Sequence, residues 1–188
     1  MTGGHGHDHV EGGDKRTALL VAVLAAMLAI TEMGGKSAQT HGLADHIDAS
    51  NLWSFFQAKT IRQTTMRTAA DAIEAQFKEG GQAMPAGLKK QADTWRATAQ
   101  RYETEPETGE GRKELAARAK TKEAARDKAL SAYHMFEYGS AALQLAIVLA
   151  GAAALTSVVY LTFISVGLGV VGLLFGALGF LAPTLLHL

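Results

Sequence analysis

Cysteine is absent from this 188-residue chain, which excludes disulfides, thiol catalysis and cysteine-ligated zinc centres. The chain also lacks a net charge, because 18 Lys and Arg residues balance 18 Asp and Glu residues. A nucleic-acid surface needs a basic field that displaces counterions. We therefore expect no nucleic-acid partner.

Lys, Arg, Asp and Glu are all missing from residues 139–188. This apolar segment is long enough for two membrane-spanning helices, which we place at residues 139–158 and 162–184. A third apolar run, residues 17–35, follows Lys15 and Arg16 and carries Glu32 near its end. A cleaved signal peptide is the alternative interpretation of this run. We expect an uncleaved transmembrane helix, and hence a lipid bilayer as the protein's main partner.

Residues 1–16 are rich in Gly and His and have few apolar side chains. Such a composition favours a disordered tail. Alternating His5, His7 and His9 could bind a divalent cation through their imidazoles, and they are the only metal ligands that we nominate. A solvated tail without a role in metal binding is the alternative.

The region between the apolar runs is densely charged, and its pattern predicts three helices. Gly34 and Gly35 are predicted to end the first apolar helix. A long amphipathic helix is predicted for residues 36–77, with one apolar face formed by Leu43, Ile47, Phe55, Ile61, Met66, Ala69, Ile73 and Phe77. A second helix is predicted at 86–102, with a heptad-like seam, and a third from Arg112 into the membrane.

The lengths of these helices predict their arrangement. At 1.5 Å per residue the outgoing helix rises roughly 60 Å, about as far as the two returning helices together. The fold class that we expect is an all-α membrane protein, with three transmembrane helices and an extramembrane antiparallel helical (coiled-coil-like) stalk at residues 36–138. Trp53, Phe55 and Phe56 cluster in this stalk. Two helices can hardly bury all three aromatic side chains, so we expect them to contact a partner.

Small residues recur at steps of three and four in the apolar runs, where they permit close approach of helix backbones in lipid. We predict that five of them form a packing face of the last span: Ser165, Gly169, Gly172, Gly176 and Gly179. Two further sets have similar spacing: Ala18, Ala22, Ala25 and Ala29, and Ala142, Ala146, Ala150, Ala153 and Ser157. For these alanines, a composition common to membrane helices is an equally good explanation.

No catalytic constellation or cofactor motif can be nominated. His41, Asp45 and His46 are too few for a metal site, and a solvated helix face explains them. Glu32 and Glu137 lie at predicted span ends, where water or headgroups reach them, and Gln144 is expected to bond a neighbouring helix. Gly167, Gly169 and Gly172 match GxGxxG, but no strand precedes them. We expect no enzyme activity and no cofactor.

Three segments resemble a bacterial family of small membrane proteins that is catalogued only as a domain of unknown function. They are DASNLWSFFQAKTIRQ at 48–63, RYETEPETGEGRKELAARAKTKEAARD at 101–127, and LQLAIVLA at 143–150. The resemblance covers nearly all of the chain after Lys15. It implies a three-span bacterial membrane protein and brings no activity, cofactor or catalytic residue.

The flanking charges give a weak signal for orientation. Lys15 and Arg16 before the first span, against Lys36 after it, favour a cytoplasmic N-terminus and a periplasmic stalk in the bacterial inner membrane. Lys120, Lys122, Arg126 and Lys128 before the second span favour the opposite.

Our leading functional hypothesis is a non-enzymatic, membrane-anchored helical scaffold that self-associates through small-residue transmembrane faces. The alternative is an accessory subunit on the periphery of a larger respiratory, photosynthetic or transport complex. A small channel or transporter is less favoured, because its polar candidates, Thr156, Ser157, Thr162 and Ser165, are bunched at one end.

Overall fold

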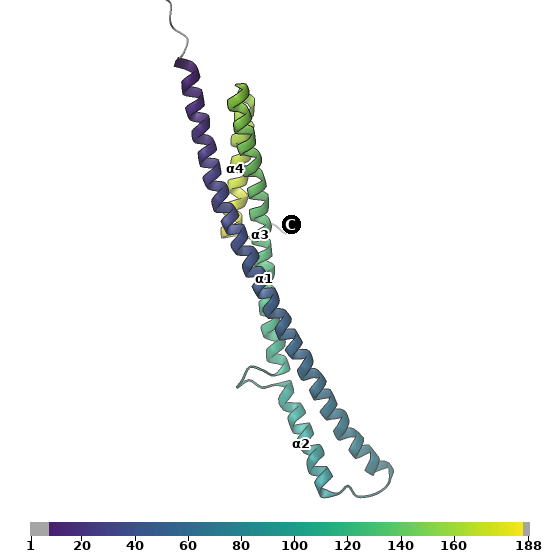
Figure 1. The fold of residues 1–188 in the computed structure, drawn as a ribbon. Coiled ribbons are helices and arrows are strands. Elements are labelled where there is room, and N and C mark those ends of the chain that lie inside the picture. Colours follow the sequence, from purple (N-terminus) through teal and green to yellow (C-terminus); the bar gives the residue numbers. More distant parts are fainter. Residues whose placement is uncertain (1–7, 186–188) are drawn as a thin grey trace, which may run out of the picture. The chain divides into compact units, whose positions relative to one another are not determined.

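The computed structural model describes residues 8–185, and the side chains from Lys15 onward. Within that range it has four helices and no strand (Figure 1). They are α1 (Asp8–Glu79), α2 (Ala86–Glu103), α3 (Arg112–Thr156) and α4 (Val159–Leu181). Three of them, α1, α3 and α4, contain segments long and apolar enough to span a membrane. The expected all-helical fold with three apolar helices is confirmed.

The helix ends follow from local sequence. Helix α1 stops at Gly80 and Gly81, and Gly81 has φ of +61°, a left-handed conformation that glycine adopts without steric cost. Pro85 precedes α2, where its lack of an N–H costs nothing, and its carbonyl accepts from the N–H of Lys89 at 3.0 Å. Gly109, with φ of +67°, turns the acidic loop before α3.

The predicted break at Gly34 and Gly35 is wrong, because α1 runs through both residues. A glycine in a helix costs about 1 kcal/mol relative to alanine. Here, however, both glycines are buried, and a Cβ on Gly34 would lie 2.8 Å from Cζ of Phe136. The missing side chains make room for this aromatic ring of α3, so the glycines serve helix packing instead of helix termination.

Other boundaries also differ from the predicted ones. Helix α1 begins at Asp8, inside the segment expected to be a disordered tail. Helix α4 occupies 159–181 in place of the expected 162–184, since Ser157, with φ of +56°, makes the turn after α3. As predicted, α3 continues from Arg112 without a break into the charge-free segment.

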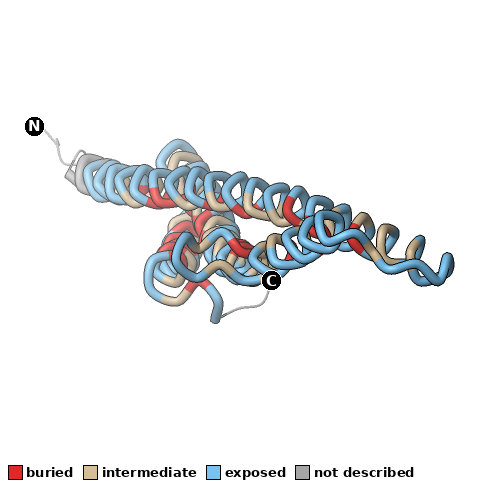
Figure 2. The backbone as a smooth tube through the Cα atoms, turned by 90° about the horizontal axis from the view of Figure 1, so that it is seen from below, coloured by how far each residue is buried: buried red, intermediate tan, exposed pale blue. Residues whose placement is uncertain are grey.

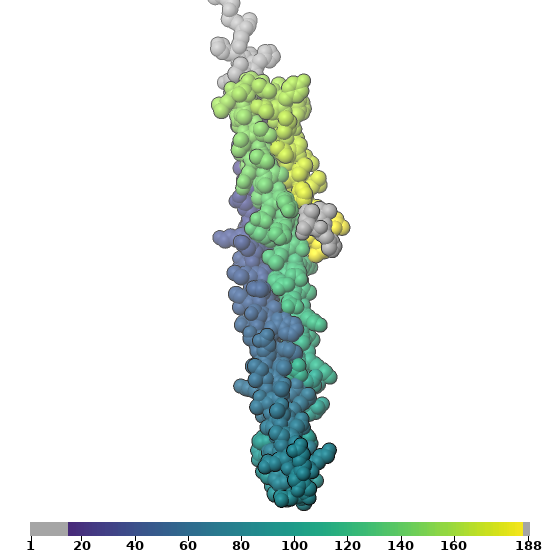
Figure 3. Space-filling model, turned by 90° about the vertical axis from the view of Figure 1, so that its right-hand side faces the viewer, coloured from purple at the N-terminus to yellow at the C-terminus, as the bar shows by residue number. Residues whose placement is uncertain are grey.

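The chain divides into two compact units, which we describe separately. Unit 1 comprises Met1–Leu43 and Arg126–Leu188, and unit 2 comprises Ala44–Ala125. In unit 1, α4 lies against the C-terminal part of α3 (yellow against green in Figure 3). Unit 2 contains the C-terminal part of α1, all of α2 and the start of α3.

Buried residues recur at intervals along the helices, with exposed residues between them (Figure 2). The single apolar face predicted for residues 36–77 is wrong in part. Leu43, Ile47 and Ile61 are 59%, 50% and 66% exposed, whereas Ala70 is fully buried. The intervals of six residues from Phe55 to Ile61 and of five from Ile61 to Met66 do not keep a helical face, so Ile61 lies on a different face from Phe55 and Met66.

Candidate functional site

The five small residues predicted to form a packing face of α4 are all buried in unit 1. A Cβ on Gly172 would lie 2.6 Å from Cγ of Leu143 and 2.8 Å from the carbonyl oxygen of Gly139, and a Cβ on Gly169 would lie 2.7 Å from Leu24. These neighbours come from α3 and α1 of the same chain. This glycine face is therefore occupied within one chain.

The ends of the glycine face meet polar and aromatic groups. Ser165 donates a 2.7 Å hydrogen bond to the carbonyl of Ala146 on α3. A Cβ on Gly179 would lie 2.8 Å from the ring of Phe136, which packs edge-on against Phe180 with centroids 4.7 Å apart. Serine and glycine thus let α4 approach both neighbours without leaving a buried hydroxyl unpaired.

The alanine sets have different environments. On α3, Ala146, Ala150 and Ala153 are buried in unit 1, whereas Ala142 is half-buried and Ser157, which follows the helix, is exposed. On α1, the whole set is exposed: Ala18, Ala22, Ala25 and Ala29. Among the residues that the structure describes, no helix covers the α1 alanines.

The polar groups expected near the span ends lie together in unit 1. Gln144 donates to Glu32 at 3.2 Å, which agrees with the expectation that Gln144 bonds a neighbouring helix. Glu137 accepts from the hydroxyl of Tyr133 at 2.8 Å. These residues line a shallow cavity of about 500 Å³ that Lys36 also lines. Both carboxylates already have donors from their own chain.

In unit 2 a polar cluster joins all three helical segments. Arg112 donates to Glu103 at 2.8 Å and to the hydroxyl of Thr60 at 2.9 Å. Gln63, which is 2% exposed, donates to Glu103 and to the carbonyl of Ala99, both at 2.9 Å. We call Gln63, Glu103 and Arg112 the clasp.

The electrostatics of the clasp follow from these bonds. The hydrogen bond from Gln63 lowers the pKa of Glu103, and the positive charge of Arg112 lowers it further. Beside the clasp, Lys59 is 5% exposed and pairs with Glu105 at 3.1 Å. Among residues 15–185 no buried side-chain nitrogen or oxygen is left without a partner. The clasp is thus a satisfied network that holds helices together.

The predicted partner-contact aromatics are mostly engaged within unit 2. The indole of Trp53 donates to Glu123 at 2.8 Å and packs edge-on against Phe56, with ring centroids 5.4 Å apart. The guanidinium of Arg112 lies 4.9 Å from the centroid of the Phe56 ring. Only Phe55 of the three is classed as exposed, at 37%.

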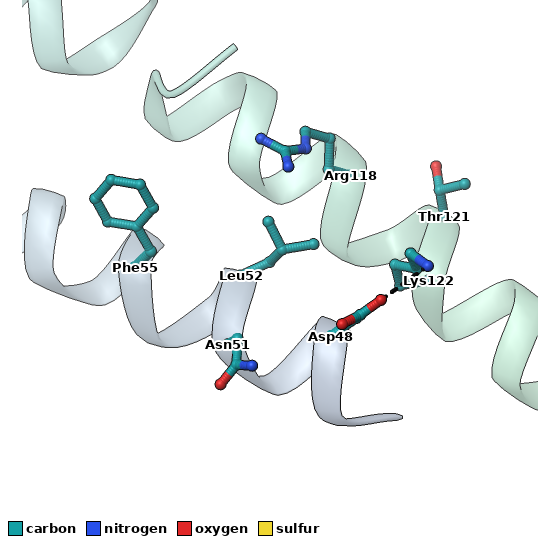
Figure 4. A pocket seen from close by; sticks show the side chains of 7 residues that line it. All are labelled: Asp48, Asn51, Leu52, Phe55, Arg118, Thr121 and Lys122. Atoms are coloured by element: carbon teal, nitrogen blue, oxygen red, sulfur yellow. Dashed lines mark ion pairs between the residues drawn. The ribbon is translucent and has the colours of Figure 1, made fainter. Parts of the chain in front are cut away.

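Phe55 lines a cavity of about 480 Å³ in unit 2 (Figure 4). Leu52 and Arg118 also line it, and Asp48 pairs there with Lys122 at 2.9 Å. The ammonium of Lys122 also donates to Asp45 at 2.9 Å. Its two carboxylate partners raise the pKa of Lys122. Asp48 and Lys122 at this cavity therefore pair with one another, whereas Arg118 donates to the carbonyl of Gly109 at 3.2 Å.

The structure adds no support for a metal centre. His5 and His7 lie outside the described residues, as does the side chain of His9. From Lys15 to Leu185, no three His, Asp or Glu side chains are grouped so as to hold a metal ion. Asp45, near His41 and His46 in sequence, accepts a hydrogen bond from Lys122.

Sequence reasoning missed the clasp, because nothing local marks Gln63 as buried. The one signal in the sequence is spacing: Gln63 lies seven residues from Phe56 and from Ala70, on the covered face of α1 that also includes Ala49. A glutamine on such a face must find partners across the helix interface.

Comparison with known proteins identifies a family and nothing beyond it. The family model described as "Domain of unknown function (DUF4337)" matches residues 13–182. No curated protein and no solved structure matches the chain.

Proposed function

The chain belongs to the DUF4337 family, and we propose that it is a non-enzymatic, membrane-anchored helical scaffold that self-associates through a small-residue transmembrane face. Unit 1 would be the anchor in this account. Unit 2 would be an extramembrane antiparallel, coiled-coil-like stalk.

The observation that best supports the anchor is the pattern of burial on α4, which is the inverse of that in a water-soluble protein. The buried positions of α4 are Gly and Ser, whereas Phe163, Leu174 and Val170 are 72%, 60% and 51% exposed. Only 17%, 33% and 28% of the most apolar windows of α1, α3 and α4 are buried. Exposed apolar surface of this extent needs a non-aqueous solvent, and a bilayer supplies it.

The exposed α1 alanines support self-association. The glycine face of α4 is filled by α1 and α3 of the same chain, so another face must serve for contact between chains. Ala18, Ala22, Ala25 and Ala29 recur at steps of four, three and four on an uncovered face. Small side chains allow the backbones of two helices to approach closely in lipid.

The order of contacts in unit 2 supports an antiparallel stalk. Glu74 of α1 pairs with Arg96, Gln63 bonds Ala99 and Glu103, and Asp45 pairs with Lys122. The residue numbers of the partners thus rise as the residue numbers along α1 fall, which is the order that antiparallel packing requires. The charged exterior of this unit fits water, and its buried polar groups all have partners among the described residues, which favours a structural role over a catalytic one.

We further propose the bacterial inner membrane as the location, with a cytoplasmic N-terminus and a periplasmic stalk. Lys15 and Arg16 flank the first apolar segment on one side, and only Lys36 flanks it closely on the other. The excess of positive charge marks the cytoplasmic side.

The test is the mass and composition of the native particle, extracted gently from its own membrane without overproduction. We expect a particle made of several copies of this chain. Ala22→Phe should reduce it to smaller species, whereas Ala177→Phe, at an exposed position of α4, should leave it intact. A monomer would overturn the proposal, and a particle dominated by other proteins would favour an accessory subunit.

A further inference from the structure

The C-terminal part of α1 presents two faces in unit 2, and only one is covered. The covered face includes Ala49, Phe56, Gln63 and Ala70 and packs against α2 and α3. The other face begins at Ala44 and continues to Ala75 at strictly alternating steps of three and four residues. All ten of its residues are exposed, and we call it the open seam.

The open seam has the spacing of a coiled coil. A repeat of 3.5 residues keeps one face of a helix against a second helix over many turns. In heptad terms the d positions are Ile47, Ser54, Ile61, Thr68 and Ala75, and the a positions are Ala44, Asn51, Ala58, Thr65 and Ala72. Ile47 and Ile61 are 50% and 66% exposed. Two large apolar side chains thus lie exposed two heptads apart on this face.

Charge is excluded from the open seam, although α1 is charged on its other faces. Asp48, Arg62, Arg67 and Asp71 all lie between seam positions. An uncharged face does not repel its own copy, and it offers nothing to a partner that is recognised by charge. A shallow hollow of about 590 Å³ lies on this face, with Ile61, Thr65 and Thr68 among its lining residues.

We propose that the open seam binds the open seam of a second copy of this chain, as a parallel coiled coil in register. Two copies inserted into one membrane in the same direction have parallel α1 helices. This inference therefore rests on the proposed function, and it adds the surface and the partner in the stalk.

Two details favour pairing in register. Asn51 is the only amide side chain in the open seam, and a single asparagine at an a position meets its counterpart in a parallel pair, which specifies register. The flanking positions would place Gln57 opposite Arg62 and Asp71 opposite Gln76 of the other copy. None of these pairs brings like charges together.

The same repeat occurs in the part of α1 that belongs to unit 1. Leu19, Val23, Ala26, Ile30 and Met33 are all exposed at alternating steps of four and three residues. Lipid can cover these side chains, so they do not carry the proposal. Lipid cannot cover a seam in a water-exposed stalk, and for this reason the test concerns residues 44–75.

Because the chain has no cysteine of its own, a disulfide between two copies can form only between introduced cysteines. Ser54→Cys and Thr68→Cys place a thiol at d positions, and Arg67→Cys and His46→Cys place one at exposed positions off the seam. The full chain would be oxidised in its native membrane with copper phenanthroline and run on a non-reducing gel. We expect both seam variants to form several-fold more covalent dimer than both controls.

A parallel pair in register brings each d residue to its own counterpart, within the short distance that a disulfide requires. Equal trapping at all four positions, or none at the seam, would overturn the proposal. A second variant checks the contact itself: Ile61→Glu should abolish trapping at Ser54→Cys, whereas Arg67→Glu should not. Trapping that survives Ile61→Glu would contradict a seam contact.

The composition of the native particle distinguishes failure of the seam contact from failure of the proposed scaffold function. A particle of this chain alone, with no trapping at the seam, would retain the scaffold and overturn the seam. A particle dominated by other proteins would overturn both.

Discussion

Helix α4 in unit 1 buries Gly169, Gly172 and Gly176 and exposes Val170 and Leu174. Helix α1 in unit 2 buries Gln63 and Lys59 and exposes charged side chains between the residues of the open seam. Helix α4 thus buries its smallest side chains and exposes many of its large apolar ones, whereas unit 2 buries polar groups that are paired. This difference is what we expect if one chain is adapted to two solvents, as proposed: small residues let helices pack closely in lipid, and buried polar groups need partners in a water-exposed unit.

The largest expected effect comes from filling the glycine face. Gly172→Leu places a side chain where even a Cβ would lie 2.8 Å from a backbone oxygen of α3. The backbone of α3 cannot move away without a large loss of stability. We expect a loss of about 3 kcal/mol in the free energy of unfolding of unit 1, measured by dodecyl sulfate titration in mixed micelles.

Gly167 provides the matched control for Gly172, because nothing lies within 4 Å of a Cβ built on it. Gly167→Leu should change the free energy of unfolding by less than about 0.5 kcal/mol. If both variants lose the same stability, close packing of α4 is not what holds unit 1 together.

The next effect concerns the clasp of unit 2. Arg112→Ala removes the donor to Glu103 and Thr60 and leaves the carboxylate with fewer partners. We expect a loss of about 1–3 kcal/mol, measured by chemical denaturation of the full chain in detergent. Arg62→Ala, at an exposed position, is the control and should unfold like the parent.

A smaller effect is the pH dependence of unit 2. The pKa of Glu103 is lowered in the folded chain, chiefly by the hydrogen bond from Gln63. Its contribution to stability is therefore complete above the ordinary glutamate pKa of about 4.3 and is lost as pH falls through the lowered value. Glu103→Gln should be less stable than the parent at neutral pH. The two proteins should converge in acid, and a gap that persists there would contradict the role of this carboxylate.

The smallest effect belongs to the exposed ion pairs. Arg96 pairs with Asp71 at 2.7 Å and also with Glu74, and these carboxylates raise its pKa. Arg96→Ala should shift the denaturation midpoint only slightly, because exposed pairs contribute little. The shift should vanish at about 1 M salt, where the Debye length is roughly 3 Å. A large shift that is insensitive to salt would mean that Arg96 acts through packing.

Much of this fold was predictable, because its boundaries are local. Pro85, Gly81 and Gly109 mark the ends of helices by backbone chemistry that needs no tertiary structure. The continuity of α1 through Gly34 and Gly35 was not predictable. It depends on Phe136, about a hundred residues away in sequence, whose ring fills the space that the glycines leave.

The candidate surfaces were predictable only in part. The spacing of Gly169, Gly172 and Gly176 indicates a packing face, but spacing cannot say whether the neighbour comes from the same chain. Trp53 and Phe56 were expected to contact a partner, yet Glu123 and Arg112 of their own unit engage them. These contacts depend on which face of α1 packs against the returning helices, and the sequence of α1 alone does not decide this.

Collision accessibility of spin labels tests the two-solvent account most directly. Single cysteines at Val148 and Val170 of unit 1 and at Arg67 and Gln76 of unit 2, all exposed, would carry the label in native-like membranes. The account predicts that labels in unit 1 collide readily with oxygen and poorly with a polar nickel complex, and that labels in unit 2 do the reverse. Labels at Val148 and Val170 that collide with the nickel complex as readily as those at Arg67 and Gln76 would contradict a lipid-facing unit 1.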